Sequence, residues 1–145
     1  MAEQPREEAN PVMRSAAKPE DVASYVDVSF TTVSGIDRAI CILTGRKNSP
    51  DTPADELRMI EYEYGDQIAK KARVFAQMNA FMANQRTMRP PTDEMIASAK
   101  KLAKVLDGMI AANITASQVV VTSTQLFKIW QKTEAQVVPG YSTSS

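Results

Sequence analysis

The 145-residue sequence contains no histidine, one cysteine and five glycines. Without histidine the chain lacks the usual general base and the commonest metal ligand. A single cysteine cannot form an intramolecular disulfide, and no cysteine–histidine spacing typical of a zinc site is present. So few glycines argue against a glycine-rich loop that holds phosphates. We therefore expect no enzyme activity, no cofactor, no metal and no small-molecule substrate.

Long apolar runs are also missing. The longest nearly uncharged stretch, Met109 to Leu126, has 18 residues and contains eight polar ones, which is too polar for a membrane span. The first twenty residues are polar and include acids, so no secretory signal is expected. The lone Cys41 lies in the apolar run 39–43, which favours a buried structural thiol. We expect a chain made in the cytoplasm, without a membrane span.

The length fits one domain with short terminal segments. Residues 1–18 contain prolines and mixed charge but little apolar bulk, and they are expected to form an extended arm or a disordered tail. Residues 138–145 have the same character. A helical bundle is expected to occupy residues 19–137.

Three long helices are predicted from the apolar periodicity. In the first, near 20–44, apolar residues recur every three or four positions up to Gly45, which is expected to end the helix. The alternation over 26–30 also fits a strand, but the helical pattern has more matches. A second helix, near 53–88, begins with Thr52 as N-cap and Pro53 at the first turn. Thr92 is expected to cap a third, near 93–135.

The third helix changes its apolar face after Asn113. Either the chain breaks near 112–115, or the second part of the helix buries a different surface; a short strand at 119–122 is a weaker alternative. The sequence therefore predicts an all-α fold, an elongated antiparallel bundle of three long helices with the third bent near 113, flanked by extended arms.

The shifted face predicts contact with a neighbouring subunit, and packing inside the chain itself is the alternative. It consists of Val119, Val120, Leu126, Phe127 and Trp130. Helices of unequal length leave apolar surface open at one end of a bundle, and such surface on a soluble chain implies a partner. Self-association into a homo-oligomer or polymer is the simplest expectation.

Basic residues concentrate between positions 67 and 104 in a chain of zero net charge. Eight cations stand against two acids there, and they are the candidate contacts to a DNA or RNA backbone: Lys70, Lys71, Arg73, Arg86, Arg89, Lys100, Lys101 and Lys104. Cations also gather at helix C-termini because of the helix dipole, which is the alternative for those of the second helix. The acids Glu61, Glu63 and Asp66 are expected on a solvated face.

These features favour a non-enzymatic structural subunit of a homo-oligomeric assembly. The basic residues around the turn between the second and third helices would contact nucleic acid, as in a helical coat protein that becomes part of a virion. The expected architecture resembles that of helical-bundle coat proteins of filamentous viruses. The alternative is a helical adaptor or secretion-type chaperone, which would bind a partner's helix through a methionine-rich stripe and have no nucleic-acid role.

Overall fold

The computed structural model describes residues 18–84 and 89–135. They form α3 (Pro19–Lys47), α4 (Ala54–Asn84), α5 (Asp93–Asp107), a short 3-10 helix η1 (Ala111–Asn113) and α6 (Ala116–Ala135). The predicted all-α fold is confirmed over these residues, none of which is in a strand. Apart from Lys18, the expected arms at 1–18 and 138–145 lie outside the described residues.

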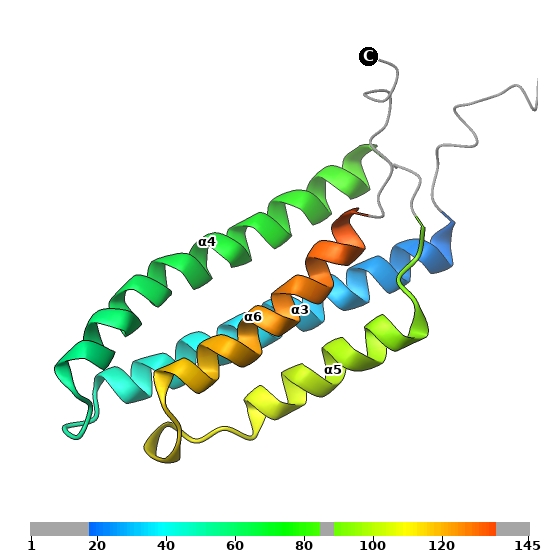
Figure 1. Ribbon diagram of the computed structural model, residues 1–145. Coiled ribbons are helices and arrows are strands. Elements are labelled where there is room, and N and C mark those ends of the chain that lie inside the picture. The colour runs from blue at the N-terminus through cyan, green and yellow to red at the C-terminus, as the bar shows by residue number, and fades with distance from the viewer. Residues whose placement is uncertain (1–17, 85–88, 136–145) are drawn as a thin grey trace, which may run out of the picture.

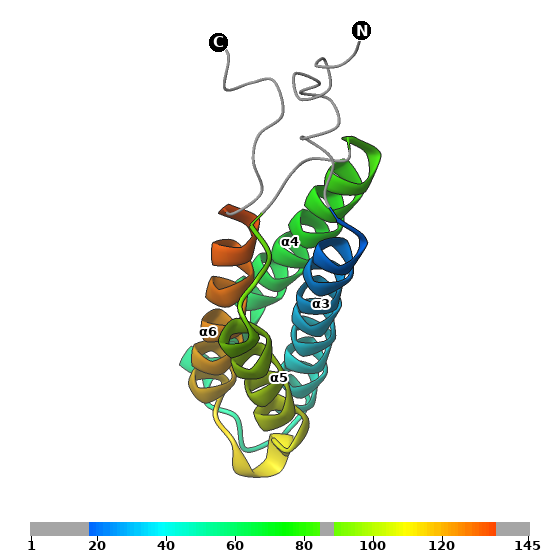
Figure 2. The same ribbon diagram turned by 90° about the vertical axis from the view of Figure 1, so that its right-hand side faces the viewer.

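The four long helices form an elongated up-and-down bundle, in which consecutive helices run in opposite directions (Figure 1). α3 packs against α4, α5 and α6, and α6 also contacts the two remaining helices. α4 and α5 are not a packed pair; they lie on opposite flanks of the α3–α6 pair (Figure 2). The two helices that the sequence joins around residue 90 are therefore separated in space.

Small residues on α3 explain why α3 and α6 approach each other across the bundle. A Cβ at Gly35 would collide with the side chain of Leu126 on α6. Nearby, the buried hydroxyl of Ser29 accepts a hydrogen bond from Trp130 Nε1 at 3.2 Å. Because these two helices meet closely, α4 and α5 are left on the outside of the pair.

The expectation of three long helices is wrong, because the predicted third helix is two helices. α5 ends at Asp107, Gly108 follows, and Ile110 has an extended backbone before η1. The break lies at 108–115 and includes the predicted position. A capping box starts α6: Gln118 N donates to Thr115 Oγ1 at 3.3 Å, and Thr115 N donates to Gln118 Oε1 at 2.9 Å. This local signal could have been read from the sequence.

Two of the expected helix boundaries also differ. α3 continues through Gly45 to Lys47, and Gly45 instead lets α3 approach η1, since a Cβ there would lie 2.7 Å from that of Ala111. The Thr52 hydroxyl does not cap α4 but donates to the Arg46 carbonyl oxygen at 2.5 Å. The predicted cap at Thr92 is confirmed, because its side chain accepts from Met95 N at 3.1 Å.

The core is divided along the bundle. Ile60, Leu106, Leu126 and Leu43 lie in the cluster towards the α3–α4 turn. Val74, Ile36 and Trp130 belong to a second cluster, and Tyr25 packs with Phe81 and Met78 at the far end. Cys41 is not part of this core. The expectation of a buried thiol is wrong, because Cys41 lies on the outward side of α3 and is exposed.

Candidate nucleic-acid and self-association surfaces

The candidate cations of α4 are paired with acids. Lys70 Nζ lies 2.9 Å from Asp66 Oδ2, one turn away on the same helix. Lys71 Nζ contacts Asp37 Oδ1 of α3 at 2.7 Å. These pairs neutralise much of the charge that the sequence concentrates on this segment.

Arg73 also holds helices together. Its Nη2 lies 3.0 Å from Glu134 Oε1 at the end of α6, and its guanidinium lies over the rings of Phe127 and Trp130, 5.9 and 5.8 Å from the centroids. Lys70 Nζ is 5.2 Å from the Phe127 centroid. These side chains attach α4 to α6 through cation–π contacts and an ion pair.

The lysines of α5 differ from those of α4. Lys100, Lys101 and Lys104, here called the α5 basic face, are all exposed. Lys100 Nζ forms an exposed ion pair with Asp27 Oδ2 at 3.1 Å. Within the described chain, Lys101 and Lys104 have no acidic group within 4.0 Å. They keep a free positive charge.

The eight candidate nucleic-acid residues therefore do not form one surface. Lys70, Lys71 and Arg73 belong to α4 and the α5 basic face belongs to α5, and these two helices lie on opposite flanks of the bundle (Figure 2). Arg86 lies outside the described residues, and Arg89 is exposed just before α5. The fold therefore divides the described cations between two helices that are not packed against each other.

The predicted intersubunit residues pack inside the chain. Val119, Leu126, Phe127 and Trp130 are buried, and Val120 is half-buried. Leu126 lies against Gly35 of α3, and Trp130 donates to Ser29 of the same helix. Phe127 lies beside Lys70 and Arg73 of α4. For these three residues the structure shows packing inside the chain, which was the alternative to an intersubunit role. Phe127 and Trp130 also stack on each other, with centroids 5.4 Å apart. Four of these five side chains are therefore part of the core of the chain itself.

The outward side of α4 carries a stripe of exposed, uncharged residues. Exposed residues recur there at alternating spacings of three and four, the heptad pattern of helix pairs: Tyr62, Gly65, Ala69, Ala72, Ala76, Asn79 and Ala83. Ile68 lies beside them, and Tyr62 and Ile68 are 71% and 58% exposed. We call these eight residues the α4 outer face. It contains no charged residue, although charged residues normally cover the exposed side of a helix.

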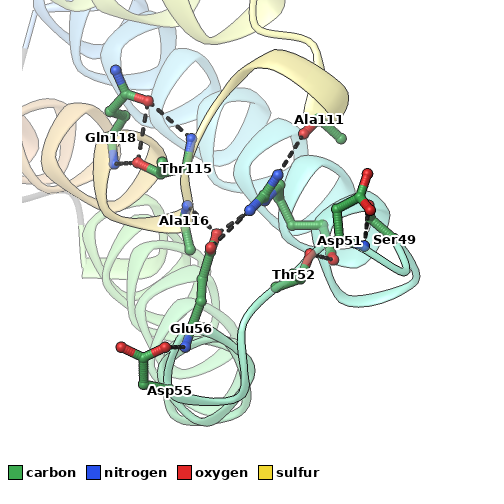
Figure 3. A network of polar contacts seen from close by, with 10 residues as sticks. Ser49, Asp51, Thr52, Asp55, Glu56, Ala111, Thr115, Ala116 and Gln118 are labelled. Atoms are coloured by element: carbon green, nitrogen blue, oxygen red, sulfur yellow. Dashed lines mark hydrogen bonds and ion pairs between the residues drawn. The ribbon is translucent and has the colours of Figure 1, made fainter.

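A polar network closes the end of the bundle where α3 turns into α4 (Figure 3). Arg46 makes two parallel bonds to Glu56, Nε–Oε2 at 2.9 Å and Nη2–Oε1 at 2.7 Å. Glu56 Oε2 also accepts from Ala116 N at 2.9 Å, which ties the start of α6 to α4. The Arg46 bond lowers the pKa of Glu56, and the same bond raises the pKa of Arg46. This arrangement links the end of α3, the start of α4 and the start of α6.

Glu63, Gln67 and Ser123 form a polar group between α4 and α6. Gln67 Nε2 donates to Ser123 Oγ at 3.1 Å, but Gln67 Oε1 and Glu63 Oε1 are buried and have no hydrogen-bond partner among the described residues. Burial, with a smaller contribution from the charge of Asp66, raises the pKa of Glu63. The expected solvated face is therefore wrong at Glu63, whose Oε1 is buried, while Glu61 is exposed.

The described residues do not assemble a metal site. No group of three His, Cys, Asp or Glu side chains is close enough there to hold a metal ion. None of the described helices is long and apolar enough to cross a membrane. Comparison with protein-family models, curated proteins and solved structures gives no match to this chain. The α4 outer face and the α5 basic face are therefore the candidate functional surfaces.

Proposed function

We propose that this protein is a non-enzymatic structural subunit of a homo-oligomeric assembly, of the kind formed by helical coat proteins, and that it contacts nucleic acid. One observation carries the proposal: the two flanks of the bundle have opposite chemistry. The α4 outer face carries no charged residue, whereas the α5 basic face carries two lysines, Lys101 and Lys104, that have no acidic partner among the described residues. One flank suits a second copy of the chain, and the other suits a polyanion.

Self-association is supported by the composition of the α4 outer face. Its small residues, such as Ala69, Ala72 and Ala76, allow two helix backbones to approach closely, while Tyr62 and Ile68 supply apolar area. The face follows residues 62–83, about 33 Å of helix at 1.5 Å per residue. Two copies of α4 laid against each other would cover this surface on both chains, as in an isologous dimer.

Nucleic-acid contact is supported by the α5 basic face. These lysines lie at positions i, i+1 and i+4 of one helix, on the side away from the core residues Ala99 and Leu106. Lysines near a phosphate backbone bind it through charge and release counterions, so the affinity falls steeply with salt. The proposal therefore predicts binding that is not specific for sequence and is strongest at low salt.

The test is light scattering across protein concentration, with gel filtration in the presence and absence of DNA at two salt concentrations. The proposal expects a mass that rises with concentration and a DNA complex that dissociates at high salt. A protein that stays monomeric and ignores DNA at low salt would end the proposal.

The alternative is a helical adaptor with a methionine-lined groove. Among the described residues, Met78 is buried, and Met59 and Met109 pack against the core cluster near Leu43. Met82 is exposed. These positions favour ordinary core filling over a groove. A small discrete oligomer that binds no nucleic acid and captures another protein would support the adaptor instead.

A further inference from the structure

A shallow open groove lies between α3 and α5, beside the α5 basic face. α3 contributes Phe30, Thr31 and Ser34; α5 contributes Lys100, Ala103, Lys104 and Asp107. Its volume is about 350 Å³, at the lower end of the range for small-molecule sites. A groove of this volume has room for one small planar group.

Phe30 supplies an aromatic surface at this groove. Its ring packs edge-to-face with Phe75 of α4, with centroids 6.4 Å apart and planes at 75°. This contact orients the ring, yet the residue remains 52% exposed. A large aromatic side chain that is held in place but uncovered, next to cations, is the arrangement on which bases of single-stranded nucleic acids stack.

The polar groups of the groove suit a phosphate. Lys100 is engaged by Asp27, whereas Lys104 in the groove and Lys101 beside it have no acidic partner in the described ranges. Thr31 and Ser34 provide two hydroxyls that are not engaged by any other described residue. The groove also contains one carboxylate, that of Asp107 at the last position of α5.

We infer that this groove takes one nucleotide of a single-stranded nucleic acid, with the base stacked on Phe30 and the adjacent phosphate at Lys104 and the two hydroxyls. The inference rests on the nucleic-acid role proposed above and makes it specific. A base inside a duplex has both faces covered by its neighbours, so it cannot stack on Phe30. The protein should therefore prefer single strands.

The test is fluorescence anisotropy of the full-length protein with a labelled oligothymidylate and with the same strand in a duplex, over a salt series. Wild-type protein should bind the single strand at least about tenfold more tightly, since stacking of one base contributes that much. Phe30→Leu keeps apolar contact with Phe75 but removes the flat ring, and it should weaken single-strand binding about fivefold while leaving duplex binding unchanged.

Lys104→Gln should weaken binding of both forms and reduce the slope of log affinity against log salt by about one. Lys128→Gln is the matched control, because Lys128 is exposed on α6 and away from the groove.

Amide chemical shifts of Thr31 and Ser34 in wild-type protein provide a readout that does not depend on how a variant folds, and they should move when the oligothymidylate is added.

Two results separate the inference from the proposed function. If wild-type protein binds nucleic acid but Phe30→Leu and Lys104→Gln behave like Lys128→Gln, the groove site is wrong and the nucleic-acid role stands. Equal affinity for single strand and duplex also overturns the groove site alone. If wild-type protein binds neither form at low salt, the nucleic-acid role itself falls.

Discussion

α4 and α5 come from one basic segment of the sequence, but they present opposite surfaces. The cations of α4 are used inside the fold: Lys71 pairs with Asp37, and Arg73 pairs with Glu134. The α4 outer face carries no charged residue. α5 keeps Lys101 and Lys104 free at the surface. The charge of a sequence segment is therefore a poor measure of the charge of the surface it forms.

The two helices are also held differently. α4 is fixed by buried or half-buried polar groups, chiefly Glu56 with Arg46 and Gln67 with Ser123. α5 is held by apolar packing and by Arg38 of α3, whose guanidinium donates to the carbonyl oxygens of Leu106 and Met109 at 3.3 and 2.7 Å. Removing a charge should therefore affect stability most on α4 and binding most on α5.

Glu56→Ala should have the largest effect. It leaves Arg46, which is only 11% exposed, without its partner and removes the acceptor of Ala116 N, so we expect a loss of about 3 kcal/mol in the free energy of unfolding. Urea denaturation measures it. The control is Asp27→Ala, which breaks the exposed pair with Lys100 on the α5 side and should cost no more than about 0.5 kcal/mol.

The pH dependence of Glu56 follows from its lowered pKa. Because the folded value lies below the ordinary value of 4.5, its contribution is complete above 4.5 and is lost as the pH falls through the folded pKa. Glu56→Ala should lack this acid-side loss. If Glu56→Ala and Asp27→Ala lost the same free energy of unfolding in urea, the α4 and α5 flanks would be held alike.

Ala72→Glu tests the apolar side of the comparison. A carboxylate in the middle of the α4 outer face must be desolvated when two copies pair, so the dissociation constant of the oligomer should rise at least tenfold, about 1.4 kcal/mol. Sedimentation or light scattering measures the mass. Ala97→Glu makes the same change on exposed α5 and should leave the mass unaltered; a similar loss in both variants would contradict a specific α4 contact.

Glu63→Gln addresses the buried polar group of α4. Because the folded pKa of Glu63 is raised above 4.5, wild-type protein loses stability as the pH rises from 4.5 through the folded value. The neutral amide avoids this and should raise the free energy of unfolding at neutral pH by about 1 kcal/mol. Denaturation at several pH values gives the profile. Glu61→Gln, at an exposed position of the same helix, is the control. An equal rise in the free energy of unfolding in Glu61→Gln would exclude burial of Glu63 as the cause.

The smallest expected effect is on nucleic-acid binding, and it should distinguish the lysines of α5 from those of α4. Lys101→Gln should weaken nucleic-acid binding about twofold to threefold and lower the salt slope by about one, as for loss of one phosphate contact. Lys71→Gln removes a cation that already pairs with Asp37 and should leave the salt slope unchanged. Identical slopes for both variants would mean that the pairing on α4 does not matter for binding.

Local interactions explain what could be predicted. The helical periodicity, the Thr92 cap and the break before residue 116 depend on residues three or four positions apart, and the structure contains all three. The capping box at Thr115 and Gln118 was equally readable but was missed. The heptad of the α4 outer face was also readable, although the larger apolar residues on the opposite side dominate the pattern of that helix.

The sequence by itself determined an all-α chain and the positions of most helix ends, because hydrogen bonding and capping act within a turn or two. Only the tertiary structure decided which charges are paired and which helices are neighbours. Arg73 and Glu134 are 61 positions apart, and the close contact of α3 with α6 at Gly35 separates α4 from α5. Such long-range contacts depend on how side-chain volumes fit together, which no local pattern records.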